Sequence, residues 1–207
     1  MPDAVNDPPT RRSRAKADRR DALLKAAAEL FAERGFNGVS LEDLGAAAGV
    51  SGPAVYRHFA GKQAVLGALL VGVSEHLLAG GESVVAHAAA DGEALLGLVR
   101  FHVDFALSNP DVIRVQDRDL TSLTDADHVA VRSLQRTYVE LWVQVLSRLH
   151  PGADAASLRI RAHAVFGLIN STPHSARAPG PDATRLSRTK VGAILEQLAG
   201  AALLAPA

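Results

Sequence analysis

The chain has 207 residues with a formal net charge of zero at pH 7, and 48% of them are hydrophobic but only 4% aromatic. This length allows one or two domains with a real core, and a composition dominated by alanine and leucine favours packed helices over sheets. The absence of cysteine excludes disulfides and thiolate metal sites. The N-terminus has no apolar signal core, and the longest apolar run, residues 64–73, is too short to span a bilayer, so we expect a cytoplasmic protein with no membrane partner.

The N-terminal segment is basic although the whole chain is neutral. Residues 11–20 carry six Lys or Arg against one Asp. Residues 1–17 are polar and have no apolar periodicity, so we predict an arm that is disordered without DNA. Such a charge run is also typical of a solvated tail. Beside a DNA-reading element, the same arm would lie along the phosphates or the minor groove, with Arg11, Arg12 and Arg14 as contacts.

An amphipathic helix is predicted over residues 21–34, and Gly35 ends it. Two short helices follow, joined by a tight turn at Gly49, where a left-handed conformation would stop the first helix. Ser40 is suited to cap the first helix, and Ser51 is suited to cap the second. This pattern is the physical recipe of a helix-turn-helix, whose second helix enters the DNA major groove.

The second short helix has one inward and one outward face. Val55 and Phe59, at i and i+4, anchor it inward, which leaves the following residues toward the outside: Gly52, Pro53, Ala54, Tyr56, Arg57 and His58. A helix-Gly-helix corner that binds nothing has the same packing needs, so spacing alone leaves both interpretations open. Small residues at the helix start and hydrogen-bond donors after it favour DNA.

Residues 18–70, including the runs AAAELF and AERGFNGVSLEDLGAAAGVSGPAVYRHFAGKQAVL, resemble the TetR family of bacterial transcriptional regulators. The resemblance implies a homodimer whose small-molecule ligand controls its affinity for an operator. We expect a repressor that binds a palindromic operator and is released by the ligand, although the sequence does not distinguish a repressor from an activator. The resemblance also implies phosphate-contacting roles for Ser40, Ser51, Tyr56, His58 and Lys62. Base-facing roles are implied for Gly52, Pro53, Ala54 and Arg57. Because none of these is an Asn or Gln at the helix start, specificity would come from thymine methyl contacts, Arg57 and DNA shape.

The remainder of the chain is predicted to be helical, which makes the protein all-α with about nine helices and no strand. The predicted ranges are 62–78, resuming after a break or kink at Gly80-Gly81 to residue 90, then 92–108, 111–120, 125–149, 155–171 and 182–204. We expect a flexible basic arm over residues 1–17, a helix-turn-helix DNA-binding domain over 18–64, and a ligand-binding and dimerisation domain over 65–207. The last two helices carry apolar stripes that suit a four-helix interface between two copies, although they could instead complete the monomer core.

Polar and aromatic side chains on the apolar helices indicate a ligand pocket. We expect the ligand to contact Phe101, Asp104, Arg118, Tyr138, Trp142, Phe166 and Asn170. Internal pairing is the alternative for each of them, for example between Arg100 and Asp104 at i and i+4. The cluster Arg100, Arg114 and Arg118 favours an acidic or acyl-CoA effector, whereas a wholly apolar pocket would suit a hydrophobic one. Ligand binding would shift the helix at 111–120 and, through the helix that begins at Lys62, change the separation of the two reading heads.

The sequence carries no motif of an enzyme. It has no HExxH, no GxSxG, no GxGxxG and no phosphate-binding GxxxxGK, and no two histidines are spaced at i and i+4. We therefore expect no cofactor, no metal and no catalytic residues. A helical interaction module without operator binding remains the alternative function, and an enzyme with an unmarked site is a more distant one.

Overall fold

The computed structural model describes residues 11–175 and 186–206, and within these residues the chain is all-α, as predicted. Its helices are α1 (Arg11–Arg34), α2 (Leu41–Ala47), α3 (Gly52–Tyr56), α4 (Lys62–His87), α5 (Asp91–Ser108), α6 (Pro110–Asp119), α7 (Asp125–Leu149), α8 (Ala155–Ser175) and α9 (Arg188–Leu204). Two 3₁₀ turns, at Phe36–Gly38 and Leu120–Ser122, were not predicted. No strand occurs in the described part of the chain.

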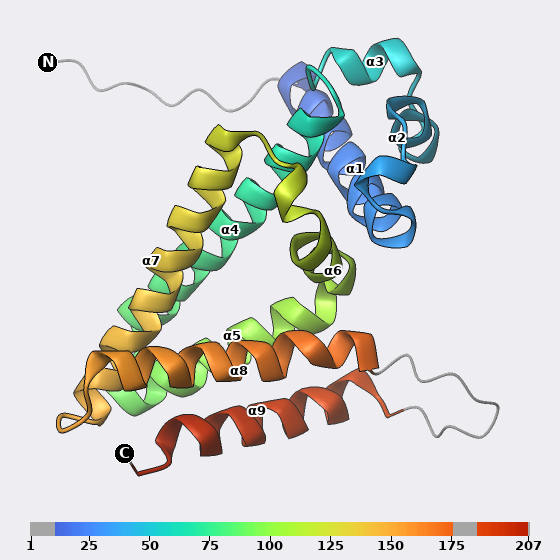
Figure 1. The fold of residues 1–207 in the computed structure, drawn as a ribbon. Helices are drawn as coiled ribbons and strands as arrows, with labels where there is room; N and C mark the ends of the chain where they lie inside the picture. The colour runs from blue at the N-terminus through green and yellow to red at the C-terminus, as the bar shows by residue number, and fades with distance from the viewer. Residues whose placement is uncertain (1–10, 176–185, 207) are drawn as a thin grey trace, which may run out of the picture.

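The first three helices and the start of α4 form a small head (Figure 1). Its core contains Leu23 and Phe31 of α1, Leu44 of α2 and Val55 of α3, all at most 1% exposed. Gly49 ends the α2 segment with φ at 68°, the left-handed conformation predicted for this turn. At Gly45 a Cβ would lie only 3.0 Å from the Val50 carbonyl oxygen, so glycine lets the two short helices approach closely.

The remaining helices form a larger body with its own core. α4 packs against α5 and α7, while α8 and α9 lie side by side and close the opposite side of α5 (Figure 1). Trp142, Leu98, Leu158 and Leu203 are fully buried in this core. Because the head and body have separate hydrophobic clusters, burial stabilises each of them around its own centre.

Helix α6 lies between the two cores. Val112 and Val115 belong to the head cluster, whereas Ile113 belongs to the body cluster. Pro110 occupies the first turn of α6, where its missing N–H costs no hydrogen bond, and α5 ends just before it at Ser108. A ten-residue helix with apolar residues on two sides therefore connects head and body by packing.

The helices α1, α4 and α9 differ most from the ranges predicted for them. α1 begins at Arg11 rather than at residue 21, so residues 11–17, predicted as a disordered arm, are helical. The run RRSRAKADRR is rich in good helix formers and contains neither Gly nor Pro, so charge alone does not prevent helix formation. Residues 1–10 of the predicted arm lie outside the described residues.

α4 is continuous through Gly80-Gly81, where the sequence predicts a break or kink. A Cβ on Gly80 would clash with the Phe101 ring, and one on Gly81 would lie 2.7 Å from Cε2 of Tyr138. These glycines serve close packing against α5 and α7 instead of interrupting the helix. The last helix begins at Arg188 rather than at residue 182, and residues 176–185 of the predicted loop and helix start lie outside the described residues.

Among the described helices, α4 alone has the length and apolar composition that a membrane span requires. Core helices of water-soluble proteins have the same properties. Val65, Leu66, Leu69 and Leu70 of α4 are buried in the head core, and its second half packs on α5 and α7. These contacts account for the apolar character of α4, which extends beyond the shorter run at 64–73.

Candidate nucleic-acid interface and ligand cavity

The outer face of α3 and its flanks carries polar side chains. Tyr56 is 57% exposed, and Ser51, Pro53 and Arg57 are exposed as well. Gly52 is half-buried. Ala54 differs from its predicted outward position, because its side chain is only 8% exposed and packs inward with Val55. This leaves Ser51, Pro53, Tyr56 and Arg57 as the accessible predicted contacts on this helix.

The two predicted capping serines differ in what their hydroxyls do. Ser40 forms a capping box with Asp43: its Oγ accepts from the Asp43 backbone N–H at 3.1 Å and donates to the Asp43 carboxylate at 2.7 Å. These hydrogen bonds lower the pKa of Asp43. Ser51 occupies the N-cap position of α3 without a side-chain capping bond. The Ser51 hydroxyl is therefore free of the helix it precedes, whereas that of Ser40 is committed to α2.

His58 lies among basic residues. Burial lowers its pKa, and the positive charges of Lys16, Arg57, Arg19 and Arg20 lower it further. Positive side chains of the first half of α1 and of the end of α3 therefore lie close enough to act on the same histidine, and together they make this part of the head electropositive. An electropositive surface attracts phosphate.

Lys62 and the arm arginines complete the predicted contacts. The Lys62 ammonium donates to the Val39 carbonyl oxygen at 2.7 Å and lies 4.5 Å from the Phe36 ring centroid. It thus ties the start of α4 to the loop before α2, a structural role that the sequence did not predict. Arg14 is exposed on α1, and the side chains of Arg11 and Arg12 lie outside the described residues.

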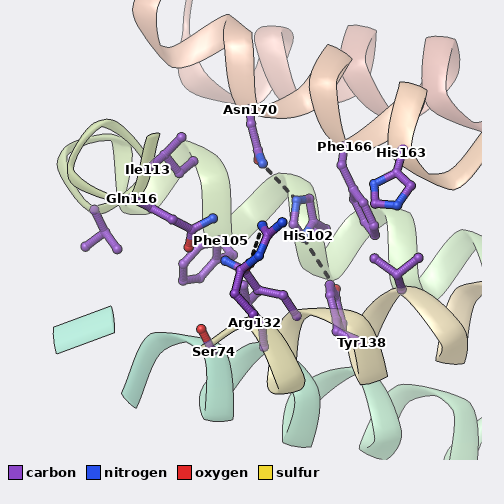
Figure 2. Close-up of a pocket in the computed structure, with 14 residues that line it drawn as sticks. Ser74, His102, Phe105, Ile113, Gln116, Arg132, Tyr138, His163, Phe166 and Asn170 are labelled. Carbon is purple, nitrogen blue, oxygen red and sulfur yellow. Dashed lines mark hydrogen bonds between the residues drawn. The ribbon is translucent and has the colours of Figure 1, made fainter. Parts of the chain in front are cut away.

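The body contains a cavity of about 210 Å³ bounded by α4, α5, α6, α7 and α8 (Figure 2). Its lining combines aromatic, aliphatic and uncharged polar side chains with one arginine, and it contains no carboxylate. The lining residues are Ser74, Leu77, His102, Phe105, Val112, Ile113, Gln116, Arg132, Gln135, Tyr138, Val139, His163, Phe166 and Asn170.

A buried histidine organises the polar side of this cavity. His102 is 4% exposed; its Nε2 lies 3.1 Å from Oδ1 of Asn170, and its Nδ1 lies 3.4 Å from the Tyr138 hydroxyl (Figure 2). Burial lowers the pKa of His102 to about 4, so the ring is neutral at pH 7. With its proton on Nε2, the imidazole donates to Asn170 and accepts from Tyr138. The rings of Phe166 and Trp142 enclose it at centroid distances of 4.9 and 6.1 Å.

The structure brings three of the seven predicted ligand contacts to the cavity wall: Tyr138, Phe166 and Asn170. Trp142 lies behind that wall, fully buried, and its indole Nε1 has no hydrogen-bond partner among the described residues. Phe101 packs on Gly80 beside His76, and the carbonyl of Asp104 accepts from Arg188 near the start of α9. Neither Phe101 nor Asp104 lines the cavity.

The three arginines predicted to cluster at the entrance are engaged elsewhere. Arg100 pairs with Glu196, and Arg114 pairs with Asp111 one turn earlier. Arg118, the seventh predicted contact, donates to the carbonyl oxygens of Phe31 and Ala32 in the last turns of α1 and pairs with the buried Asp119. Arg118 therefore joins α6 to the head and does not line the cavity.

Arg132 and Gln135 of α7 lie at the cavity and were missed by sequence reasoning. They precede Val139 and Trp142 at a spacing of i, i+3, i+7 and i+10, so they extend the same helical face by two turns. Continuing this face toward the N-terminus would have predicted them. The cavity thus has an aromatic end near Phe166 and a polar side with Arg132, and it suits an uncharged or anionic ligand with a compact apolar body.

Family models match most of the chain. The model described as bacterial regulatory proteins of the tetR family matches residues 23–69, and the one described as the tetracyclin repressor-like C-terminal domain matches residues 89–197. Among curated relatives, the HTH-type transcriptional repressor KstR2 of Rhodococcus jostii is 28% identical over 143 residues, which cover 69% of this chain and 70% of the relative.

Solved structures share the fold. A TetR-family transcriptional regulator from Bordetella parapertussis superposes with a TM-score of 0.74 at 24% identity, covering 87% of this chain and 93% of that one. AibR, solved in complex with isovaleryl coenzyme A and operator DNA, gives a TM-score of 0.69 at 19% identity over 87% of this chain and 97% of its own.

A helix-turn-helix head on an all-α body defines a DNA-binding transcriptional regulator rather than an enzyme. The match to the C-terminal domain alone covers more than half of the chain. The two matched domains together identify the family of regulators. The chain belongs to the TetR family of bacterial regulatory proteins.

Proposed function

We propose that this regulator is a repressor that binds a palindromic operator as a homodimer and is released by a small molecule held in the body cavity. The observation that carries the proposal is the position of α6. Val112, Ile113 and Gln116 of this helix line the cavity, and Arg118, further along the same helix, contacts the end of α1.

The accessible donors on the head support operator binding. Tyr56 and Arg57 are exposed at the end of α3, and the Ser51 hydroxyl is not used for capping. Together with Lys16, Arg19 and Arg20 on α1, they make one basic face. We assign phosphate contacts to Ser51, Tyr56, His58 and the arm arginines, and a base contact to Arg57.

The exposed apolar face of the body supports dimerisation. Ile194 and Leu198, one turn apart on α9, are 41% and 50% exposed, and Ile160 on the adjacent α8 is 70% exposed. Exposed large apolar side chains on two helices that pack together are typical of a surface that is buried on association. Two copies that pair α8 and α9 would bury this face and give the two-fold symmetry that a palindromic site needs.

The packing of α6 supports the release mechanism and changes one step of it. The sequence predicted that α6 would act on α4, but the main partner of α6 in the head is α1. A ligand that displaces α6 would therefore tilt the head through α1. The ligand shifts the equilibrium only by the difference between its affinities for the two arrangements.

Operator binding is tested by fluorescence anisotropy with labelled DNA that flanks the gene, against a random sequence of equal length. We expect preference for the flanking DNA and a dissociation constant that rises steeply with salt, because several phosphates are contacted. Tyr56→Phe should weaken specific binding about tenfold through loss of a phosphate hydrogen bond, with unchanged thermal stability because the side chain is exposed. Equal affinity for random DNA would favour the alternative, a helical interaction module.

A further inference from the structure

A second hollow adjoins the ligand cavity. It measures about 460 Å³ and is lined by Arg132, Gln135, Arg136, Val139, Glu140, Arg159 and His163. Four of these residues, Arg132, Gln135, Val139 and His163, also line the inner cavity. The two spaces therefore adjoin along α7 and α8, with the shared side chains between them, and the outer one, which we call the vestibule, lies beside the polar side of the cavity.

The vestibule carries excess positive charge. The Arg159 guanidinium holds the Glu140 carboxylate by two hydrogen bonds of 2.8 and 3.0 Å, so this pair is internally neutral. Arg132 and Arg136, one helical turn apart on α7, form no ion pair with any described carboxylate. Hydrogen bonds from Arg159, and then the charges of Arg159 and Arg136, lower the pKa of Glu140, and both guanidinium groups line this space.

The inner cavity is small compared with this outer space. Ligand pockets usually measure about 300–1,000 Å³, and a cavity of about 150 Å³ holds a benzene ring. At about 210 Å³, the inner cavity therefore has room for a short acyl chain or a small ring system but not for a nucleotide-sized ligand. Any larger ligand extends into the vestibule, where guanidinium groups can bind the oxygens of a phosphate or a carboxylate through paired N–H donors.

Building on the proposed function, we infer that the effector has two parts: a compact acyl group in the cavity and a phosphate-bearing carrier of the coenzyme A type in the vestibule, bound by Arg132 and Arg136. Glu140 is already paired, so it does not oppose the phosphates. The tip of Asn170 reaches the cavity wall beside His102 (Figure 2), and its amide N–H groups, which His102 does not use, offer hydrogen bonds to the acyl carbonyl.

The carrier is tested apart from the acyl group. Isothermal titration calorimetry compares coenzyme A with pantetheine, the same chain without phosphates. We expect coenzyme A to bind about tenfold or more tightly than pantetheine, less so at high salt, and Arg132→Gln with Arg136→Gln to remove the difference. Arg148→Gln is the matched control: it is on α7 too but outside the vestibule, where Arg148 pairs with Asp91. Equal affinities, or no measurable binding of either compound at about millimolar concentration, would overturn the inference.

The acyl end is followed by the fluorescence of Trp142, the only tryptophan in the chain, which packs on Phe166. A panel of short-chain and ring acyl groups, each as the coenzyme A and the pantetheine thioester, is titrated against the protein and against its operator complex. We expect only coenzyme A thioesters to release the operator at low concentration. If pantetheine thioesters released the operator at the same concentrations, the protein would still be a ligand-responsive repressor. The assignment of the phosphate-bearing carrier to the vestibule would then be wrong. Failure of operator binding itself would instead sink the proposed function.

Discussion

At the scale of single residues, His102 is the most constrained polar group of the described body. It is buried, hydrogen-bonded on both ring nitrogens and surrounded by Phe105, Tyr138, Trp142 and Phe166. A charged imidazole would be costly here, because burial removes water and no carboxylate lines the adjoining cavity. The neutral ring therefore acts as a fixed bridge between α7 and α8.

This burial makes the free energy of unfolding depend on pH. The pKa of His102 is about 4 in the folded chain against 6.5 in the unfolded one, so the unfolded state binds more protons between these values. Stability from this group is complete above pH 6.5 and falls as the pH drops toward 4. We expect a loss of about 2 kcal/mol between pH 7 and 4.5, measured by urea unfolding. His102→Gln should flatten this part of the profile, and an unchanged slope would contradict the assignment.

Two glycines of α4 form a matched pair for a test of packing. Gly80 faces the Phe101 ring, whereas a Cβ added to Gly72 would meet no neighbouring atom within 4 Å. Gly80→Ala should destabilise the protein by about 1–3 kcal/mol through overpacking. Gly72→Ala should stabilise it by about 0.5–1 kcal/mol, because alanine favours the helix. Thermal or denaturant unfolding measures the free energy of unfolding of both variants. Similar effects of the two substitutions would argue against the close contact between Gly80 and the Phe101 ring.

At the scale of elements, α6 contributes to both cores and to the cavity wall, as α4 and α7 also do. Its Val112 and Val115 pack with the head, and Ile113 packs with the body. Arg118 adds a polar connection to the C-terminal end of α1, where the Phe31 and Ala32 carbonyl oxygens accept from it and the helix dipole favours a cation.

Removal of this connection should loosen the head. Arg118→Gln is expected to cost about 1–2 kcal/mol, because it leaves Asp119, whose side chain is 8% exposed, without its ion pair. Adding Asp119→Asn should recover part of that loss, giving a coupling energy in a double-mutant cycle. Hydrogen exchange should also become faster at the end of α1. Strictly additive effects and unchanged exchange would show that α6 holds the head by apolar packing alone.

At the scale of the whole molecule, the proposed dimer depends on the exposed apolar side chains of α8 and α9. Leu198→Glu should convert the dimer to a monomer and strongly weaken operator binding, because a charge would be buried in the interface. Val129→Glu is the control, since Val129 is 68% exposed but lies on α7. Analytical ultracentrifugation measures the mass of each variant. A wild-type monomer at micromolar concentration, or an intact Leu198→Glu dimer, would refute this interface.

Much of this architecture was readable from the sequence because its signals are local. The bounds of α7 matched the prediction residue for residue, and the turn at Gly49 and the cap at Ser40 depend on neighbours only a few positions away. The helix-turn-helix and the TetR family follow from the same short segment. Periodicity alone also identified Tyr138, Phe166 and Asn170, which line the cavity, as inward-facing polar or aromatic residues.

Other features depended on contacts between segments distant in the chain. Gly80-Gly81 resembles a helix break, and only the rings of Phe101 and Tyr138 explain why it lies inside a continuous helix. The same holds for the arginines: pairing with Glu196, Asp111 and the carbonyls of α1 commits Arg100, Arg114 and Arg118, whereas Arg132 and Arg136 remain without ion pairs among the described residues. Residue type and period thus determined the helices and the family. Tertiary packing decided which charged side chains form ion pairs and which face the cavity. An ion pair depends on the distance between two groups in space, and the order of residues along the chain does not encode that distance.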